Sequence, residues 1–165
     1  MQHFVLLLLQ PGTERARRLA RRKFLAPERI DMSALAEELG VNRVTLYRWV
    51  GSRDKLRVEV VWGLADQGLS FAKDQADTEG AERIVDTVTR FLRLVIDNAG
   101  MQRWLSEEGE HAMRLLTRHD AGFQHRLIQA IEGLLEEEAR AGRLALSVDL
   151  HELAYVIVRL IESYT

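Results

Sequence analysis

The stretch that decides the fold is residues 32–49, which read MSALAEELGVNRVTLYRW. Its first half is apolar at intervals of three and four residues, the pattern of a helix with one side against a core; these positions are Met32, Leu35, Ala36 and Leu39. Gly40 follows directly, and glycine adopts the left-handed backbone conformation that ends a helix without a steric penalty. The spacing therefore predicts two short helices joined by a tight turn.

The second helix, predicted to start after the capping residue Asn42, has two unlike sides. Val41, Leu46 and Trp49 fall on the side that faces the first helix. The other side suits DNA, because Arg donates two hydrogen bonds to guanine, Thr and Val contact thymine methyl groups, and Tyr and Arg reach phosphates; its residues are Arg43, Val44, Thr45, Tyr47 and Arg48. A solvated face of an ordinary helical hairpin would more often carry Glu and Lys. The pattern predicts a helix-turn-helix that reads double-stranded DNA.

Helical patterns continue on both sides of this motif. We expect Pro11-Gly12 to end the apolar segment 4–9 and Thr13 to cap a helix that ends before Pro27. Asp31 is expected to cap the first helix of the motif, and Ser52 a longer helix after it. Beyond a polar linker, apolar residues recur with helical period over residues 84–95, 105–116, 123–139 and 150–164. The predicted fold class is all-α, with an N-terminal three-helix helix-turn-helix head and a helical-bundle body.

Charge is distributed unevenly between the two halves. Residues 1–62 hold 12 Lys and Arg against 7 Asp and Glu, whereas residues 63–165 hold 11 against 18. A basic head on an acidic body predicts that only the head meets a polyanion. The chain has no cysteine, which excludes disulfides, and the apolar residues 4–9 are too short to span a membrane. We expect a cytoplasmic protein with no membrane partner.

Residues 35–56, LAEELGVNRVTLYRWVGSRDKL, resemble the signature of the TetR/AcrR family of transcription regulators. In that signature an Ala-x-x-x-Gly-Val turn precedes a Thr-Leu-Tyr recognition helix, an aromatic residue and a short loop that starts a fourth helix. The matching residues are Ala36, Gly40, Val41, Thr45, Leu46, Tyr47, Trp49, Ser52 and Leu56. Arg53 and Asp54 stand where the family usually has Lys and Glu. The sequence of the N-terminal region and of the turn is most similar to the actinobacterial subgroup that regulates lactone and quorum-signal degradation.

The resemblance implies a residue-by-residue site on DNA. The outward face listed above would read the bases, and Arg53 and Lys55 would hold phosphate at the start of the fourth helix. Ser33, Arg15 and Arg17 would add phosphate contacts. The resemblance further implies a homodimer, a palindromic operator and a repressor that a ligand releases. Three segments follow: an arm at 1–12, a DNA-binding domain at 13–60, and a ligand-binding and dimerisation domain at 61–165.

The body offers candidates for the two remaining partners. Bulky side chains on its apolar helices are the candidates to bind a small apolar or amphipathic effector: Phe91, Val95, Trp104, Met113, Leu116, Phe123, Leu127 and Tyr155. For each of them an ordinary place in the core is the competing interpretation. The apolar stripe of residues 150–164 is predicted to form the dimer interface, joined by Leu134 and Leu135. The acidic run at 136–138 is interpreted as a solvated helix face.

Other classes of protein fit the sequence less well. Glu108 and His111 form one Glu-x-x-His pair, but helical di-iron sites need two such pairs and further carboxylates. We therefore expect no metal, no cofactor and no enzyme activity. The alternative function is a helical interaction or ligand-sensing module that does not bind DNA sequence-specifically. Repressor and activator are not distinguished by the sequence.

Overall fold

The computed structural model describes residues 10–118 and 122–164. Over these residues the chain forms helices connected by short loops, with no β-strand, as predicted. The predicted arm lies mostly outside the described residues. The helices are α2 (Gln10–Leu25), α3 (Met32–Leu39), α4 (Arg43–Val50), α5 (Arg53–Asp74), α6 (Gly80–Ile96), α7 (Ala99–Thr117), α8 (Phe123–Arg140) and α9 (Leu150–Ser163).

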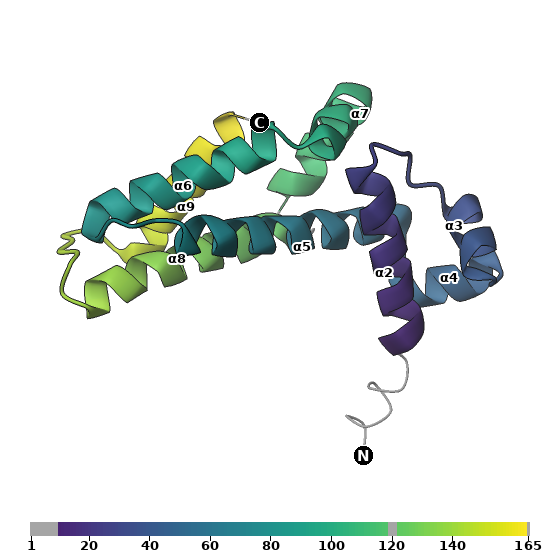
Figure 1. Cartoon of the computed structure of the whole chain (residues 1–165), viewed down its shortest axis with the longest axis horizontal. Coiled ribbons are helices and arrows are strands. Elements are labelled where there is room, and N and C mark those ends of the chain that lie inside the picture. Colours follow the sequence, from purple (N-terminus) through teal and green to yellow (C-terminus); the bar gives the residue numbers. More distant parts are fainter. Residues whose placement is uncertain (1–9, 119–121, 165) are drawn as a thin grey trace, which may run out of the picture.

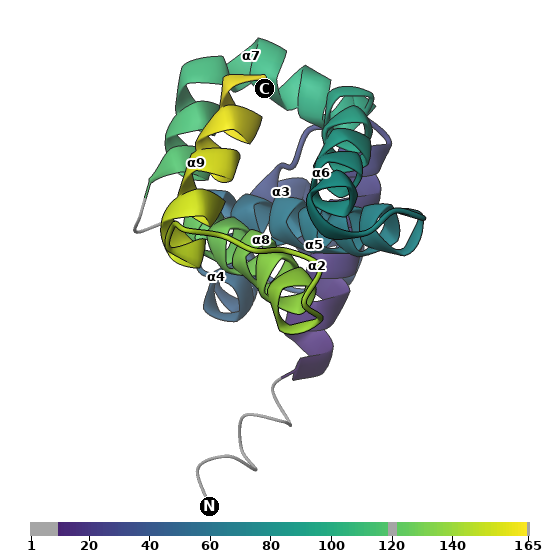
Figure 2. The same cartoon turned by 90° about the vertical axis from the view of Figure 1, so that its left-hand side faces the viewer.

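Helix α5 is the axis of the molecule. Figure 1 shows α2, α3 and α4 gathered around its N-terminal end and α6, α8 and α9 lying along its other end. The second view places α6 on one side of α5 and the pair formed by α8 and α9 on the other (Figure 2). Because α5 runs unbroken from the head into the body, a displacement of body helices can be passed to the head through one rigid element.

The helix ends in the head follow the predicted local chemistry. The Asp31 carboxylate accepts hydrogen bonds from the backbone N–H groups of Ser33 and Ala34, both at 2.9 Å, and so caps α3. Gly40 ends α3 with φ 70°, in the left-handed region. The inner residues predicted for α3 are all buried, which confirms that side of the motif.

The start of the first head helix differs from the prediction. Helix α2 begins at Gln10 and runs through Pro11 and Gly12, so Thr13 is not its cap. The apolar segment 4–9, which Pro11-Gly12 was expected to end, lies outside the described residues. Proline fits the first turn of a helix because no hydrogen bond is required of its nitrogen there. The Thr13 hydroxyl instead donates to the Trp49 carbonyl at 3.3 Å. Gly12 is required by packing, since a Cβ on it would lie 2.5 Å from Trp49 Cε2.

The body also contains one irregular helix. Helix α7 begins at Ala99, earlier than predicted, because Asn98 accepts a hydrogen bond from the Met101 N–H at 2.9 Å and caps it. Its backbone departs from helical geometry at Glu108, with φ −132° and ψ 30°. The N-terminus of α7 lies against the end of α2, where a Cβ on Gly100 would come within 2.1 Å of the Phe24 carbonyl oxygen. Head and body therefore meet in close contact here.

Candidate nucleic-acid interface and ligand cavity

Helix α4 presents the predicted reading face to solvent. The Asn42 side chain accepts a hydrogen bond from the Thr45 N–H at 2.8 Å and caps the helix. Val44 is 69% exposed and Tyr47 is 38% exposed, although both are large and partly apolar. The Arg43 guanidinium lies 6.0 Å from the centre of the Tyr47 ring. Thr45 is half-buried, and the other four outward positions are exposed, as groove contact requires.

The opposite side of α4 holds the helix in place. Leu46 and Val50 are buried, and Trp49 is half-buried against the first turn of α2. Val50 was missed from the sequence, although it lies four residues after Leu46 and so on the same helix face. The hydrogen bond from Thr13 adds a second tie between α2 and α4. This packing fixes the direction in which the exposed face points.

The residues predicted to hold phosphate lie around the same end of the molecule. The Ser52 hydroxyl accepts from the Lys55 N–H at 3.0 Å and caps α5, and the Lys55 side chain is exposed. Arg53 is half-buried, and one of its nitrogens lies 3.4 Å from a Glu108 oxygen. Ser33 is exposed in the first turn of α3 and Arg15 in the second turn of α2. The exposed Arg17 lies 3.4 Å from Glu59.

Behind this surface lies a charged cluster that the sequence did not reveal. Arg57 is buried and donates to both oxygens of Glu108, at 2.8 and 3.2 Å. Its guanidinium also lies 5.2 Å from the Trp104 ring. The hydrogen bonds from Arg57 lower the pKa of Glu108, with added attraction from Arg53. His111, the other half of the Glu-x-x-His pair, lies 3.1 Å from an Asp54 oxygen. Both members of that pair thus have α5 side chains as partners.

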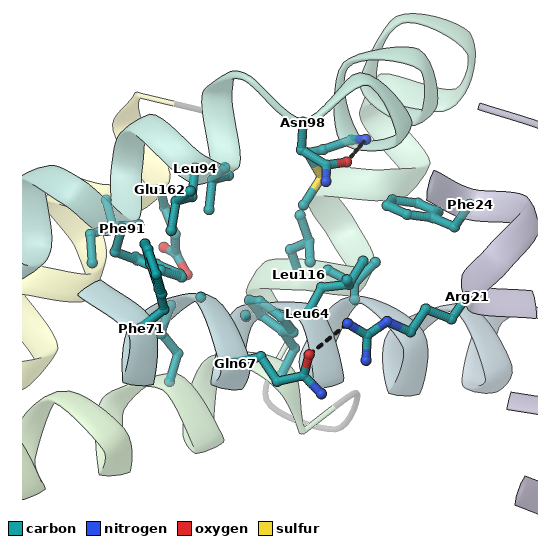
Figure 3. A pocket seen from close by; sticks show the side chains of 18 of the residues that line it. Arg21, Phe24, Leu64, Gln67, Phe71, Phe91, Leu94, Asn98, Leu116 and Glu162 are labelled. Carbon is teal, nitrogen blue, oxygen red and sulfur yellow. Dashed lines mark hydrogen bonds between the residues drawn. The ribbon is translucent and has the colours of Figure 1, made fainter. Parts of the chain in front are cut away.

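A cavity of about 450 Å³ lies between α2, α5, α6, α7, α8 and α9, within the size range of small-molecule sites. Six of the eight predicted ligand residues line it: Phe91, Val95, Met113, Leu116, Phe123 and Leu127. Figure 3 shows side chains from both head and body helices turned towards it. Arg21 and Phe24 were missed as lining residues, because nothing local in the α2 sequence indicates contact with the body.

The two other predicted ligand residues lie elsewhere. Trp104 is buried beneath Phe24, with the rings 6.2 Å apart, and its indole nitrogen has no hydrogen-bond partner among the described residues. Tyr155 is exposed on α9. Trp62 packs edge-on against Phe123 at 6.0 Å, with Arg126 over its ring. The apolar part of the cavity lining therefore consists of aliphatic, Phe and Met side chains and contains no tryptophan.

Helix α9 packs on α8 through Ala154, Val158 and Ile161. Its other side exposes apolar side chains to solvent: Tyr155, Val156, Leu160 and Tyr164. Leu134 and Leu135 are buried within the chain, so they do not form part of this exposed face, contrary to expectation. An amphipathic helix buries one of its faces in the core of its own chain. The sequence did not indicate that Leu134 and Leu135 belong to that buried face of α8.

The acidic run at 136–138 is also different from the prediction. Glu138 is completely buried. Its carboxylate accepts hydrogen bonds from Arg143 at 2.7 and 2.8 Å and from the Gly80 N–H at 2.8 Å, and these offset the cost of burying the charge. These bonds, chiefly those from Arg143, lower its pKa to about 2 despite the opposing effect of burial. Glu138 thereby ties the start of α6 to the end of α8.

Among residues 10–118 and 122–164, no three His, Asp or Glu side chains are grouped so that they could hold a metal ion. None of the helices described has both the length and the apolar character needed to cross a bilayer.

The head with its exposed recognition helix and the all-helical body define the class of helix-turn-helix transcription regulators. Within that class the chain belongs to the TetR family, because residues 79–165 match the model of the tetracyclin repressor-like C-terminal domain. This confirms the family that residues 35–56 indicated. TetR-family proteins are DNA-binding regulators rather than enzymes.

Similar proteins support the same family. The chain is 35% identical over 82 residues to two HTH-type transcriptional regulators of Mycobacterium tuberculosis, from strains CDC 1551 and H37Rv. That match covers 48% of this chain and 41% of each relative, so it spans less than half their length. The transcriptional repressor QsdR of R. erythropolis is 30% identical, with a TM-score of 0.83 over 90% of this chain and 78% of that structure. The match to QsdR is in keeping with the subgroup that the sequence resembles.

Proposed function

We propose that the protein is a ligand-released repressor that binds a palindromic operator as a homodimer. The observation that carries the proposal is the exposed face of α4, which combines Arg43, Val44 and Tyr47 on a helix anchored from behind. Val44 and Tyr47 expose apolar surface that contact with a groove would cover, and together with Arg43 they match the groups that a major groove presents. The similarity to QsdR, a transcriptional repressor, supports repression rather than activation.

The dimer would place two copies of α4 in successive major grooves, about 34–36 Å apart. The exposed apolar side of α9 supports this arrangement, because its large side chains would be buried between two copies. Residues 13–60 would bind DNA, and residues 61–165 would supply both the dimer interface and the effector cavity. A protein with these partners works in the cytoplasm, where it meets the chromosome.

The effector would act through the cavity. Its lining is mostly apolar and includes residues of α2 and α5, the helices on which the head is built. A ligand that prefers one head separation by a few kcal/mol suffices to shift the dimer out of register with the operator. We expect a small apolar or amphipathic molecule, in keeping with the lining.

The proposal is tested by fluorescence anisotropy with duplexes from the region upstream of the protein's own gene. We expect specific binding that weakens steeply between about 50 and 200 mM salt, because phosphate contacts release counterions. Arg43→Ala should weaken binding roughly tenfold or more, the loss of one good base contact. Arg140→Ala, an equal change at an exposed site on α8, should bind as the unsubstituted protein does. Equal affinity of the two variants for the duplex would refute the proposal that the exposed face of α4 contacts the bases.

A further inference from the structure

Apart from Asn98, the polar side chains of the cavity lie at its two ends. Figure 3 shows Arg21 and Gln67 together at one end, and Glu162 beside Phe91 at the other. The wall between them is lined by aliphatic and aromatic residues and by Met101 and Met113. A ligand that fills this space therefore needs a long apolar part and can carry a polar group only at an end.

At the Glu162 end the charge is already compensated. One carboxylate oxygen lies 2.6 Å from a nitrogen of Arg159, and the other accepts a hydrogen bond from Gln124 at 2.8 Å. A cationic ligand group would have to compete with Arg159 for this carboxylate. Asn98, the remaining polar residue of the lining, is neutral, and its side-chain oxygen caps α7. Neither group offers a free charge to the ligand.

The Arg21 end is different. Arg21 donates a hydrogen bond of 2.6 Å to the Gln67 side-chain oxygen, which is a neutral acceptor. Within the described part of the chain no carboxylate lies within 4 Å of its guanidinium. The Arg21 guanidinium therefore lines the cavity without a carboxylate partner among the described residues, and its hydrogen bond to Gln67 is open to solvent. Guanidinium and carboxylate match each other as planar groups with two parallel hydrogen bonds, and such charged bonds are about twice as strong as neutral ones.

We propose that the cavity binds an amphiphilic carboxylate, whose charged end pairs with Arg21 in place of Gln67 and whose hydrocarbon part occupies the apolar space. One guanidinium balances one negative charge, which favours a monoanion over a phosphate ester. Arg21 belongs to head helix α2, whereas Gln67 and the hydrocarbon wall belong to the body. The ligand would thus connect the two parts and change their relative position. This inference rests on the proposed effector site and names the class of molecule that fills it.

The test measures binding of straight-chain carboxylates from hexanoate to dodecanoate by isothermal titration calorimetry, below their micelle concentrations. The matched neutral ligands are the corresponding methyl esters. We expect at least one carboxylate to bind roughly tenfold or more tightly than its ester, the difference that one charged hydrogen-bonded pair makes. Equal binding of acid and ester, or binding of neither, overturns the proposal.

Three variants locate the site. Arg21→Gln should lose the preference for the acid, with a carboxylate affinity roughly tenfold lower. Arg18→Gln, an equal change at an exposed position of α2 outside the cavity, should bind as the unsubstituted protein does. Gly68→Leu should abolish binding of acid and ester alike, because a Cβ there already lies 3.7 Å from Phe91 and longer side chains fill the cavity. A carboxylate that binds Arg21→Gln as tightly as the unsubstituted protein contradicts the proposed anchor.

DNA binding without ligand, measured by the anisotropy assay, separates this inference from the proposed function. If the protein binds its operator but no carboxylate, the ligand class is wrong while the regulator remains. If it binds a carboxylate through Arg21 but no DNA, the proposed function fails and the cavity assignment stands. Thermal unfolding followed by circular dichroism verifies that each variant is folded.

Discussion

Glu138 keeps its negative charge in the interior of the protein because Arg143 and the Gly80 N–H hydrogen-bond to both of its oxygens. Burial alone would raise the pKa of a carboxyl group, but here the hydrogen bonds from Arg143 outweigh it and bring the pKa to about 2. The start of α6 and the loop after α8 are therefore joined through one side chain. Removing that side chain leaves Arg143 and the Gly80 N–H without their acceptor.

Replacing Glu138 by Gln should lower the free energy of unfolding at pH 7 by roughly 1.5 to 3 kcal/mol, the contribution of hydrogen bonds to a charged group, because Arg143 is itself only partly buried. The native pKa is below the ordinary value of 4.5, so the stabilisation is complete above that value and is lost as the pH falls towards 2. Urea unfolding at several pH values measures both effects. Glu137→Gln changes an exposed neighbour that pairs with Lys73, and should cost less than about 1 kcal/mol.

At the scale of elements, the irregular turn of α7 connects the body to the start of α5. Glu108 sits at the non-helical residue of α7 and contacts both Arg57 and Arg53. Arg53 is one of the cations proposed to hold phosphate, so a body carboxylate competes with DNA for it. The same helix supplies Met113 and Leu116 to the cavity wall. A movement of α7 at the cavity would therefore change the contact between Glu108 and Arg53 at the DNA-binding surface.

Glu108→Gln should therefore raise the affinity for operator DNA several-fold, because Arg53 is released and an additional phosphate contact becomes available. Glu110→Gln is the matched control, since it removes an equal charge from an exposed position of the same helix that pairs with Arg114. Anisotropy titrations of both variants at a series of salt concentrations measure the effect. If the two variants gain affinity equally, the effect is one of net charge and Glu108 does not restrain Arg53.

At the scale of the whole molecule, a basic head is mounted on an acidic body with an apolar outer face. The body would be repelled by phosphate, which orients the chain on DNA with the head inwards. Two copies joined through α9 would present two heads on one side. The exposed Val156 and Leu160 lie at the centre of that face.

Leu160→Glu should shift the protein from dimer to monomer and weaken operator binding by at least tenfold, because two linked heads bind far more tightly than one. Size-exclusion chromatography with light scattering gives the mass, and anisotropy gives the affinity. Val85→Glu introduces the same charge at an exposed apolar site of α6 and should leave both unchanged. A Leu160→Glu protein that remains dimeric would place the interface elsewhere.

The sequence by itself determined the features that neighbouring residues control. The caps Asp31, Asn42 and Ser52, the turn at Gly40 and the exposed face of α4 all follow from groups within a few residues of one another. The same holds for the helical period of the body, from which six cavity residues were predicted. Such features depend on local hydrogen bonds and on which side of a helix is apolar, and both are visible in the order of residues.

Only the tertiary structure decided which distant groups meet. Arg21 reaches the cavity, Arg57 pairs with Glu108, and Arg143 buries the charge of Glu138, where the local pattern had suggested a solvated face. Thr13 was mistaken for a cap because its partner, the Trp49 carbonyl, lies on another helix. An ion or hydroxyl is stabilised by whichever partner the packing brings near. The period of a helix shows which of its sides is packed, but not which residue of another helix lies opposite.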